Sequence, residues 1–402
     1  MPGRERRVPE GMQDTLPAAC AHKRALEAQL RAQFALHGYL EAETPLLEHY
    51  DTLTGGIAQQ RMWKTFDRGG RILALRPDST TPIARMAGTA LREAPLPLRL
   101  CYVQDVAQYP GDEQPRFCQS TQAGVELLGE GDADADAEVI ALAAQALLAA
   151  GLRDFQIDIG QVDFFKGIME ESGLPEADQE QLRAYVEQKN MLAIEMSLRE
   201  LRAGPDISRR ILQLPGLYGD EEVLESARGI TRSPRALAAL DHIGHVLRAL
   251  ADYGLADRVS IDLGMVHAIH YYTGLIFRGL TGHLGRPLLS GGRYDALPRC
   301  FGRPLPAVGF ALDVGQLLLA LQRQGDAPAA PRCRVWIGYA PAARRDAVAL
   351  ARDLRAAGTS AALHYAAEPQ ALATAAAAHG AERAVFVDDV GRQHAVWPGG
   401  EA

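Results

Sequence analysis

A single acidic side chain interrupts an otherwise apolar, strand-forming run in the stretch Gln122-Ala123-Gly124-Val125-Glu126-Leu127-Leu128-Gly129. Further short runs of the same character occur along the chain, at Ile72–Leu75, Leu98–Gln104, Phe155–Ile159, Val259–Leu263, Leu275–Arg278 and Val308–Leu312. Most of them are separated by hairpin-scale segments, which is typical of a sheet built from neighbouring strands. A carboxylate within such a strand is either a solvated residue on an exposed face or part of a buried site.

Helical patterns occur between these strands. Leu26, Leu30 and Phe34 repeat every four residues and predict a helix over 18–37 that ends at glycine. A second helix is predicted over 135–150, where an acidic run complements the helix N-terminus. Residues of about 164–253 are dominated by helical periodicity, so we expect a helical insertion within an α+β sheet domain.

The last part of the chain follows a segment rich in Gln, Gly, Ala and Pro at 321–332, a linker composition. After it, strand and helix patterns alternate and predict a small α/β unit. We therefore expect two domains, 1–325 and 331–402.

Composition excludes several functional classes. The 402 residues carry a net charge of −8 with no basic cluster, which argues against tRNA binding. Five cysteines without CxxC spacing fit free thiols in a reducing compartment. The N-terminus lacks an apolar signal region, and no run of 18 uncharged apolar residues occurs. We therefore expect a cytoplasmic protein that does not enter a membrane. The chain also lacks GxxxxGK[ST] and GxGxxG strings, so we expect no nucleotide cofactor bound through those motifs.

Several motifs between residues 8 and 320 resemble, in order, those of the histidyl-tRNA synthetase family. They are Pro9-Glu10-Gly11-Met12-Gln13-Asp14, Glu43-Thr44-Pro45 of class II motif 1, Leu75-Arg76-Pro77-Asp78-Ser79-Thr80, the Gln122–Gly129 strand, Tyr271-Tyr272-Thr273-Gly274, Gly291-Gly292-Arg293-Tyr294-Asp295, and Pro306-Ala307-Val308-Gly309-Phe310-Ala311-Leu312 of motif 3. Each fragment alone most often serves a turn or a core. Their shared order implies a class II synthetase-like fold, an antiparallel sheet flanked by helices, with a shortened anticodon-binding domain at the C-terminus.

The resemblance also implies a pocket for free histidine. An amino acid presents an ammonium group that needs acceptors and an imidazole that needs partners on both ring nitrogens. By resemblance, Asp78 and Thr80 face the α-amino group, whereas Glu126 and Tyr272 face the imidazole. The remaining expected pocket residues are Gln122, Tyr271 and Tyr294. Asp78 departs from the family's glutamate by one methylene, which could reshape ammonium recognition.

Cations that the same family uses for adenylation are missing. Attack on the α-phosphate of ATP builds negative charge that arginines stabilise, and losing one such charge costs on the order of a hundred to a thousandfold in turnover. We assign the three lost arginine positions to Val103 in motif 2, Gln316 in motif 3 and His267 ahead of the double tyrosine. The sequence therefore predicts binding without chemistry, and no catalytic residue.

Among relatives of the synthetases, this pattern resembles the regulatory subunits of ATP phosphoribosyltransferase, the first enzyme of histidine synthesis. That resemblance implies a homodimer within a larger hetero-oligomer, a short-form catalytic subunit as partner, and L-histidine as the effector. Two alternatives stay open. An active histidyl-tRNA synthetase would catalyse histidine-dependent pyrophosphate exchange, and a synthetase-like module that binds RNA or another enzyme would retain tRNA in a salt-sensitive way.

Two further motifs are interpreted as coincidences. His242-Ile243-Gly244-His245 spells a signature of class I synthetases, but it lies in a helical pattern with no preceding Rossmann strand. His267 and His270 have metal-ligand spacing, but no third ligand recurs nearby. We expect no metal site.

Overall fold

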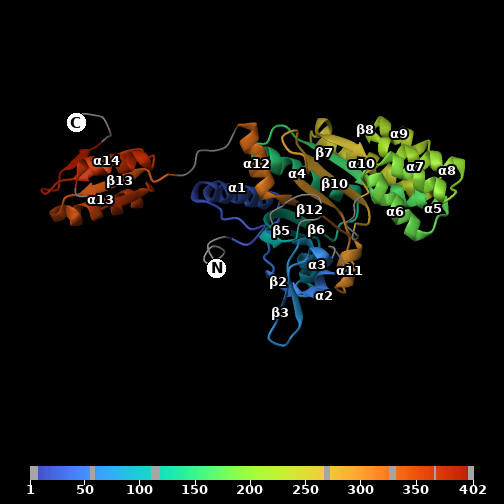
Figure 1. Cartoon of the computed structure of the whole chain (residues 1–402), viewed down its shortest axis with the longest axis horizontal. Helices are drawn as coiled ribbons and strands as arrows, with labels where there is room; N and C mark the ends of the chain where they lie inside the picture. Colours follow the sequence, from blue (N-terminus) through green and yellow to red (C-terminus); the bar gives the residue numbers. More distant parts are fainter. Residues whose placement is uncertain are drawn as a thin grey trace. The chain divides into compact units, whose positions relative to one another are not determined.

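The computed structural model describes residues 8–54, 59–109, 118–266, 272–325, 332–365 and 368–396. The chain forms two compact units, one comprising Met1–Leu16 and Lys23–Ala327, the other Pro17–His22 and Pro328–Ala402. Figure 1 shows the elements of both. No helix within the described ranges combines the length and apolar character needed to cross a membrane.

A large sheet forms the centre of the first unit (Figure 1). Its strands, in spatial order, are β1 (Leu40–Glu41), β5 (Leu98–Ala107), β6 (Gln119–Leu128), β12 (Ala307–Asp313), β11 (Leu289–Arg293), β10 (Leu275–Leu280), β7 (Gln156–Gln161), β9 (Val259–Asp262) and β8 (Tyr218–Gly219). Every pairing from β5 to β7 is antiparallel, whereas β1 pairs with β5 and β7 pairs with β9 in parallel. The expected α+β architecture is confirmed.

Helices and a smaller sheet complete this unit. The helices outside the insertion are α1 (Pro17–Leu36), which belongs to this unit from Lys23 onward, α2 (Tyr50–Leu53), α3 (Thr80–Gly88), α4 (Ala133–Ala149), α11 (Ala296–Cys300) and α12 (Val314–Gln324). The small antiparallel sheet consists of β2 (Leu47–His49), β4 (Ile72–Leu75) and β3 (Lys64–Phe66). Between β7 and β9 the chain forms a helical insertion of α5 (Val162–Ser172), α6 (Glu176–Glu187), α7 (Met191–Glu200), α8 (Pro205–Gln213), α9 (Glu222–Arg228) and α10 (Pro234–Asp252).

The second unit contains a mixed sheet with two helices. Its elements are β13 (Val335–Tyr339), α13 (Arg344–Ala356), β14 (Ala361–His364), α14 (Pro369–Ala378), β15 (Arg383–Val387) and β16 (Gln393–Ala395). The strand order is β14-β13-β15-β16, with β16 antiparallel to β15 and the other pairs parallel.

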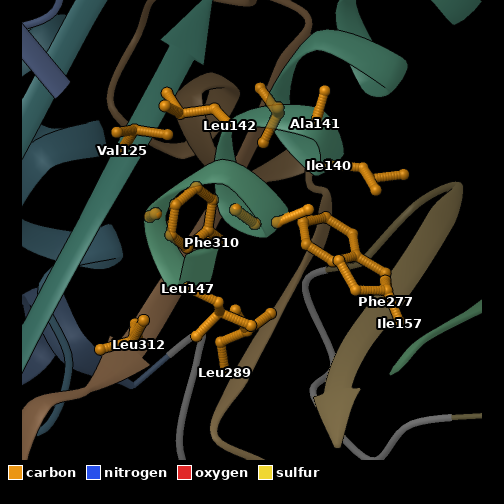
Figure 2. Close-up of a cluster of buried hydrophobic side chains, with 14 of the residues drawn as sticks. Val125, Ile140, Ala141, Leu142, Leu147, Ile157, Phe277, Leu289, Phe310 and Leu312 are labelled. Carbon is orange, nitrogen blue, oxygen red and sulfur yellow. The ribbon is translucent and has the colours of Figure 1, made fainter. Parts of the chain in front are cut away.

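The two faces of the large sheet differ in chemistry because successive side chains of a strand point to opposite sides. One face carries Val125, Phe277 and Phe310 and packs against α1, α4 and α12 in an apolar core (Figure 2). The Phe310 ring lies edge-on to Phe34 and Phe277, at centroid distances of 6.0 and 6.5 Å. The other face carries Glu126 and is covered by α3 and α11.

Several elements differ from the sequence-based expectation, since strands β3, β8 and β16 were not predicted. Residues 39–48 contribute to two strands, β1 and β2, which join different sheets on either side of Pro45. Strand β11 was not predicted, because its adjacent glycines weaken a strand pattern. A Cβ at Gly291 would lie 2.5 Å from the Gly309 carbonyl oxygen, so close packing against neighbouring strands requires glycine there.

We expect Phe310→Ala to lower the free energy of unfolding by about 3–5 kcal/mol, because it opens a cavity between the sheet and α1. Leu192→Ala is the matched control, since Leu192 on α7 is 68 % exposed, and its effect should stay within about 0.5 kcal/mol. Urea denaturation followed by circular dichroism measures both. Equal losses in the two variants would contradict the core assignment.

Candidate functional site

Glu126 lies at the centre of a buried polar cluster on the α3-covered face of the sheet. Its side chain has an exposed fraction of 0 %. Thr80 Oγ1 donates a hydrogen bond to Oε1 at 2.7 Å, and the Tyr102 hydroxyl donates to the same oxygen at 3.3 Å. The Tyr294 hydroxyl donates to Oε2 at 2.5 Å. Three separate elements, α3, β5 and the segment after β11, therefore supply hydroxyl donors to one carboxylate.

The electrostatics of this carboxylate follow from its burial. Burial raises the pKa of Glu126 to about 8, and the nearby Asp78 charge acts in the same direction. The hydrogen bonds from Tyr294, Thr80 and Tyr102 oppose that rise in the pKa by stabilising the ionised form. Among the described residues, no cation lies within ion-pair distance of Glu126. Within the part of the chain that the structure describes, the cluster is thus an acceptor site without a positive charge of its own.

Asp78 and Gln122 complete the cluster through the turn that starts α3. Asp78 Oδ1 accepts a hydrogen bond from the Thr81 backbone N–H at 2.7 Å, and Gln122 Oε1 accepts one from the Ser79 N–H at 3.2 Å. Burial raises the pKa of Asp78 as well. The turn is therefore anchored to β6 by Gln122, which holds Thr80 and Asp78 beside Glu126.

Glycine is required at two sheet positions next to the cluster. Gly309 lies directly opposite Glu126 in the β12–β6 register, and a Cβ there would lie 1.8 Å from Glu126 Oε2. Gly292 is the corresponding position on β11, where a Cβ would lie 2.9 Å from the Tyr272 ring. The glycines create the space that the carboxylate and the ring occupy.

Most of the residues expected in a ligand pocket are brought together by the fold. Asp78, Thr80, Gln122, Glu126 and Tyr294 all belong to this cluster, and Tyr272 packs in the same buried group as Tyr294. Tyr271 and His267 lie outside the described residues, and so does His270.

Tyr102 is a member of the cluster that sequence reasoning missed. Its hydroxyl also reaches the Phe310 carbonyl oxygen at 3.3 Å, and the side chain is fully buried. The available signal was the alternation of the 98–104 strand, which puts Tyr102 on the face opposite to that of Val103.

The same alternation corrects the assignment of Val103 as a lost arginine position. Val103 packs against the apolar core that contains Val125, on the far side of the sheet from Glu126. An arginine at 103 would therefore point into that core and away from the pocket, and the assignment is wrong.

Gln316 lies in the first turn of α12, where its N–H donates to Asp313 Oδ1 at 2.9 Å. Its side-chain oxygen accepts a hydrogen bond from Arg286 Nε at 2.6 Å. Arg286 therefore brings a cation to this position that the sequence did not indicate. Partial burial raises the pKa of the Asp313 carboxylate, and the charge of Arg286 opposes that rise.

Other buried arginines near the site are committed to holding the fold. Arg76 donates to the Asp105 carbonyl oxygen at 2.7 Å and to the Thr44 carbonyl oxygen. Arg293 pairs with Asp136 at 2.7 Å. Over the described ranges, no group of three or more His, Cys, Asp and Glu side chains is arranged to hold a metal ion.

Comparison with known proteins identifies relatives over most of the chain. The family model for histidyl-tRNA synthetase matches residues 11–317. An "ATP phosphoribosyltransferase regulatory subunit" of Acetivibrio thermocellus is 43 % identical over 87 % of this chain and 85 % of its own length. Its namesake in Ruminiclostridium cellulolyticum is 38 % identical over 87 % and 84 %.

Solved structures agree with these matches. The structure described as an ATP phosphoribosyltransferase regulatory subunit/histidyl-tRNA synthetase from Bacillus halodurans C has a TM-score of 0.86 and 32 % identity, covering 95 % of this chain and 98 % of that one. A histidyl-tRNA synthetase from Nostoc sp. PCC 7120 has a TM-score of 0.81 at 20 % identity, over 98 % and 97 % of the two chains, which shows the shared fold. The class II synthetase-like fold is confirmed.

The raised pKa of Glu126 makes stability depend on pH. Because the folded-state pKa is about 8 and the unfolded value 4.5, the stabilisation from the protonated form is complete below the unfolded value and is lost as pH rises through 8. We expect the free energy of unfolding of the parent, relative to Glu126→Gln, to fall by a few kcal/mol, on the order of 1.4 per pKa unit, between pH 5 and 9. Urea denaturation at several pH values measures this. A constant difference across that range would contradict the shift.

Proposed function

Because the chain belongs to the histidyl-tRNA synthetase family, and within it to the ATP phosphoribosyltransferase regulatory subunits, we propose that it binds free histidine and regulates a separate catalytic subunit of that enzyme. The observation that carries the proposal is the Glu126 cluster, a buried acceptor site with hydroxyl donors and no cation among the described residues.

The chemistry of the cluster suits histidine. A neutral imidazole has one N–H donor and one acceptor nitrogen. Glu126 accepts from the donor when ionised, and the hydroxyl of Tyr102 or Tyr294 can turn toward the acceptor nitrogen. Asp78 offers a carboxylate to the α-ammonium group. Tyr271 and Tyr272 complete the proposed pocket, with Thr80 and Gln122 fixing its carboxylates and its turn.

Adenylation is not part of the proposed function. Of the arginine positions that family resemblance assigns to the reacting phosphates, Gln316 is an amide and His267 is an imidazole. Arg76 and Arg293 are engaged with the protein itself. Arg286 lies beside one of these positions, but its side chain donates a hydrogen bond to Gln316 within the protein. We therefore propose a subunit that lacks activity of its own.

The proposed assembly is a homodimer within a hetero-oligomer that contains short-form catalytic subunits. Exposed apolar side chains gather in the motif 1 region and the small sheet, including Leu40, Leu47 and Phe66, which suits an interface with a second copy. Histidine in the pocket would then regulate the first step of histidine synthesis, and a coupling free energy of roughly 1–3 kcal/mol suffices. We propose that the protein is cytoplasmic and does not bind tRNA. We also propose that residues 331–402 form a distinct domain.

Histidine should raise the melting temperature of the parent protein, because a ligand that binds only the folded state stabilises it. We expect Glu126→Gln and Glu126→Ala to lose this rise, since neither retains a carboxylate acceptor. Glu93→Ala is the control, because the Glu93 side chain is almost fully exposed. Differential scanning fluorimetry with histidine measures the shift, and equal shifts in all four proteins would refute the pocket assignment.

Regulation is tested with the purified partner. We expect the chain to co-purify with a short-form ATP phosphoribosyltransferase and to make its rate respond to histidine, with the response lost in Glu126→Gln. The chain alone should not catalyse histidine-dependent pyrophosphate exchange. A rate that is the same with and without the chain and histidine argues against regulation, and measurable exchange would identify a working synthetase instead.

A further inference from the structure

His242 connects the helical insertion to the sheet domain. It lies on α10, and its Nε2 is 2.7 Å from Asp136 Oδ2 on α4. The contact is a hydrogen bond, and it becomes an ion pair when the imidazole is protonated. The sequence motif that contains His242 resembled a synthetase signature by coincidence. In the structure, this histidine contacts a carboxylate outside its own helix.

Asp136 also contacts β11, the strand that ends directly before Tyr294. The Asp136 side chain is completely buried. Its second oxygen, Oδ1, accepts a hydrogen bond from Arg293 Nη2 at 2.7 Å. One buried carboxylate is therefore held between a histidine of the insertion and an arginine at the end of β11.

Arg293 precedes Tyr294, which donates directly to Glu126. The Arg293 carbonyl oxygen accepts a hydrogen bond from the Thr273 N–H at 2.8 Å, and the Asp295 N–H donates to Thr273 Oγ1 at 3.0 Å. The backbone on both sides of Tyr294 is thus tied to the segment that follows Tyr272. Arg293 and Tyr294 share a peptide bond, so we expect a displacement of Arg293 to reach the Tyr294 hydroxyl at Glu126.

Helix α10 belongs to two cores at once. Its residues Leu240 and Ile243 pack in the core of the insertion, whereas Val246 and Leu250 pack in the core beneath the large sheet. His242 lies where these two packing regions meet. A displacement of the insertion relative to the sheet would therefore reach His242 along α10.

We propose that His242 is a positioning residue for the ligand pocket, through which the helical insertion sets the affinity of the Glu126 site. The route is His242, Asp136, Arg293 and Tyr294, each joined to the next by a contact or a peptide bond. The proposal rests on the proposed histidine-binding function and adds a distant element that controls it.

The first experiment compares histidine affinities by isothermal titration calorimetry. We expect His242→Ala to weaken binding about three- to tenfold, in line with modest coupling between distant sites. His242→Gln should restore affinity to within twofold, because the glutamine amide can donate to Asp136 from a similar position. His245→Ala is the matched control on the same helix, since among the described residues that ring bonds the Asp241 carbonyl oxygen one turn away and no carboxylate. Parent-like affinity in His242→Ala, or failure of glutamine to rescue, would overturn the proposal.

A double-mutant cycle tests the route itself. If His242 acts through Tyr294, the loss of affinity in His242→Ala combined with Tyr294→Phe should be smaller than the product of the two separate losses. A purely additive result would show that His242 affects binding in another way. A general loss of stability would not produce this non-additivity.

A ligand-free measurement separates this proposal from the histidine-binding function. Within the described ranges, the groups that face Glu126 are Asp78, Thr80, Tyr102 and Tyr294, and the Tyr294 hydrogen bond lowers the pKa of Glu126. If His242→Ala loosens Tyr294, the titration midpoint of Glu126 should rise, while His245→Ala leaves it unchanged. Infrared titration of the carboxyl band, with Glu126→Gln as the reference, measures the midpoint. An unchanged midpoint would refute the route even if histidine does not bind, and failure of histidine to bind the parent would refute only the proposed function.

Discussion

A carboxylate in the interior of a sheet must find hydrogen-bond donors, because burying it unpaired costs several kcal/mol. Glu126 meets this requirement through Thr80, Tyr102 and Tyr294, and no cation among the described residues pairs with it. The donors come from parts of the chain far apart in sequence, so the carboxylate fixes α3, β5 and the end of β11 relative to one another. Gly309 is the matching constraint on the neighbouring strand, since any side chain there would collide with Glu126.

This arrangement has a consequence for ligand binding. Hydroxyl groups can both donate and accept, so they can rotate to a ligand without leaving a charge unpaired. A lysine or arginine beside Glu126 would have satisfied the carboxylate permanently and removed its use as an acceptor. Burial raises the pKa of Glu126, and the Asp78 charge adds to that rise. The proposed pocket is therefore suited to a ligand that brings its own N–H donors.

The cations of this domain have mainly structural partners. Arg293 is joined to Asp136, and Arg76 to backbone carbonyl oxygens around β5. The positive charges of these two arginines therefore hold elements of the fold together and do not serve to bind phosphate groups. The link from Asp136 to His242 extends this framework into the insertion. Arg293 belongs to this network of structural contacts, and the next residue, Tyr294, belongs to the proposed binding site.

The sequence by itself determined the α+β class, the family and most of the cluster around Glu126, because ordered motifs and strand patterns are local properties of the chain. It did not determine which side of β5 each residue occupies, so Val103 was misassigned and Tyr102 was missed. Strand β11 and the neighbours of Gln316 and His242 were likewise decided by tertiary structure. The physical reason is that a side chain's environment depends on register and packing between segments distant in sequence, which no local pattern encodes.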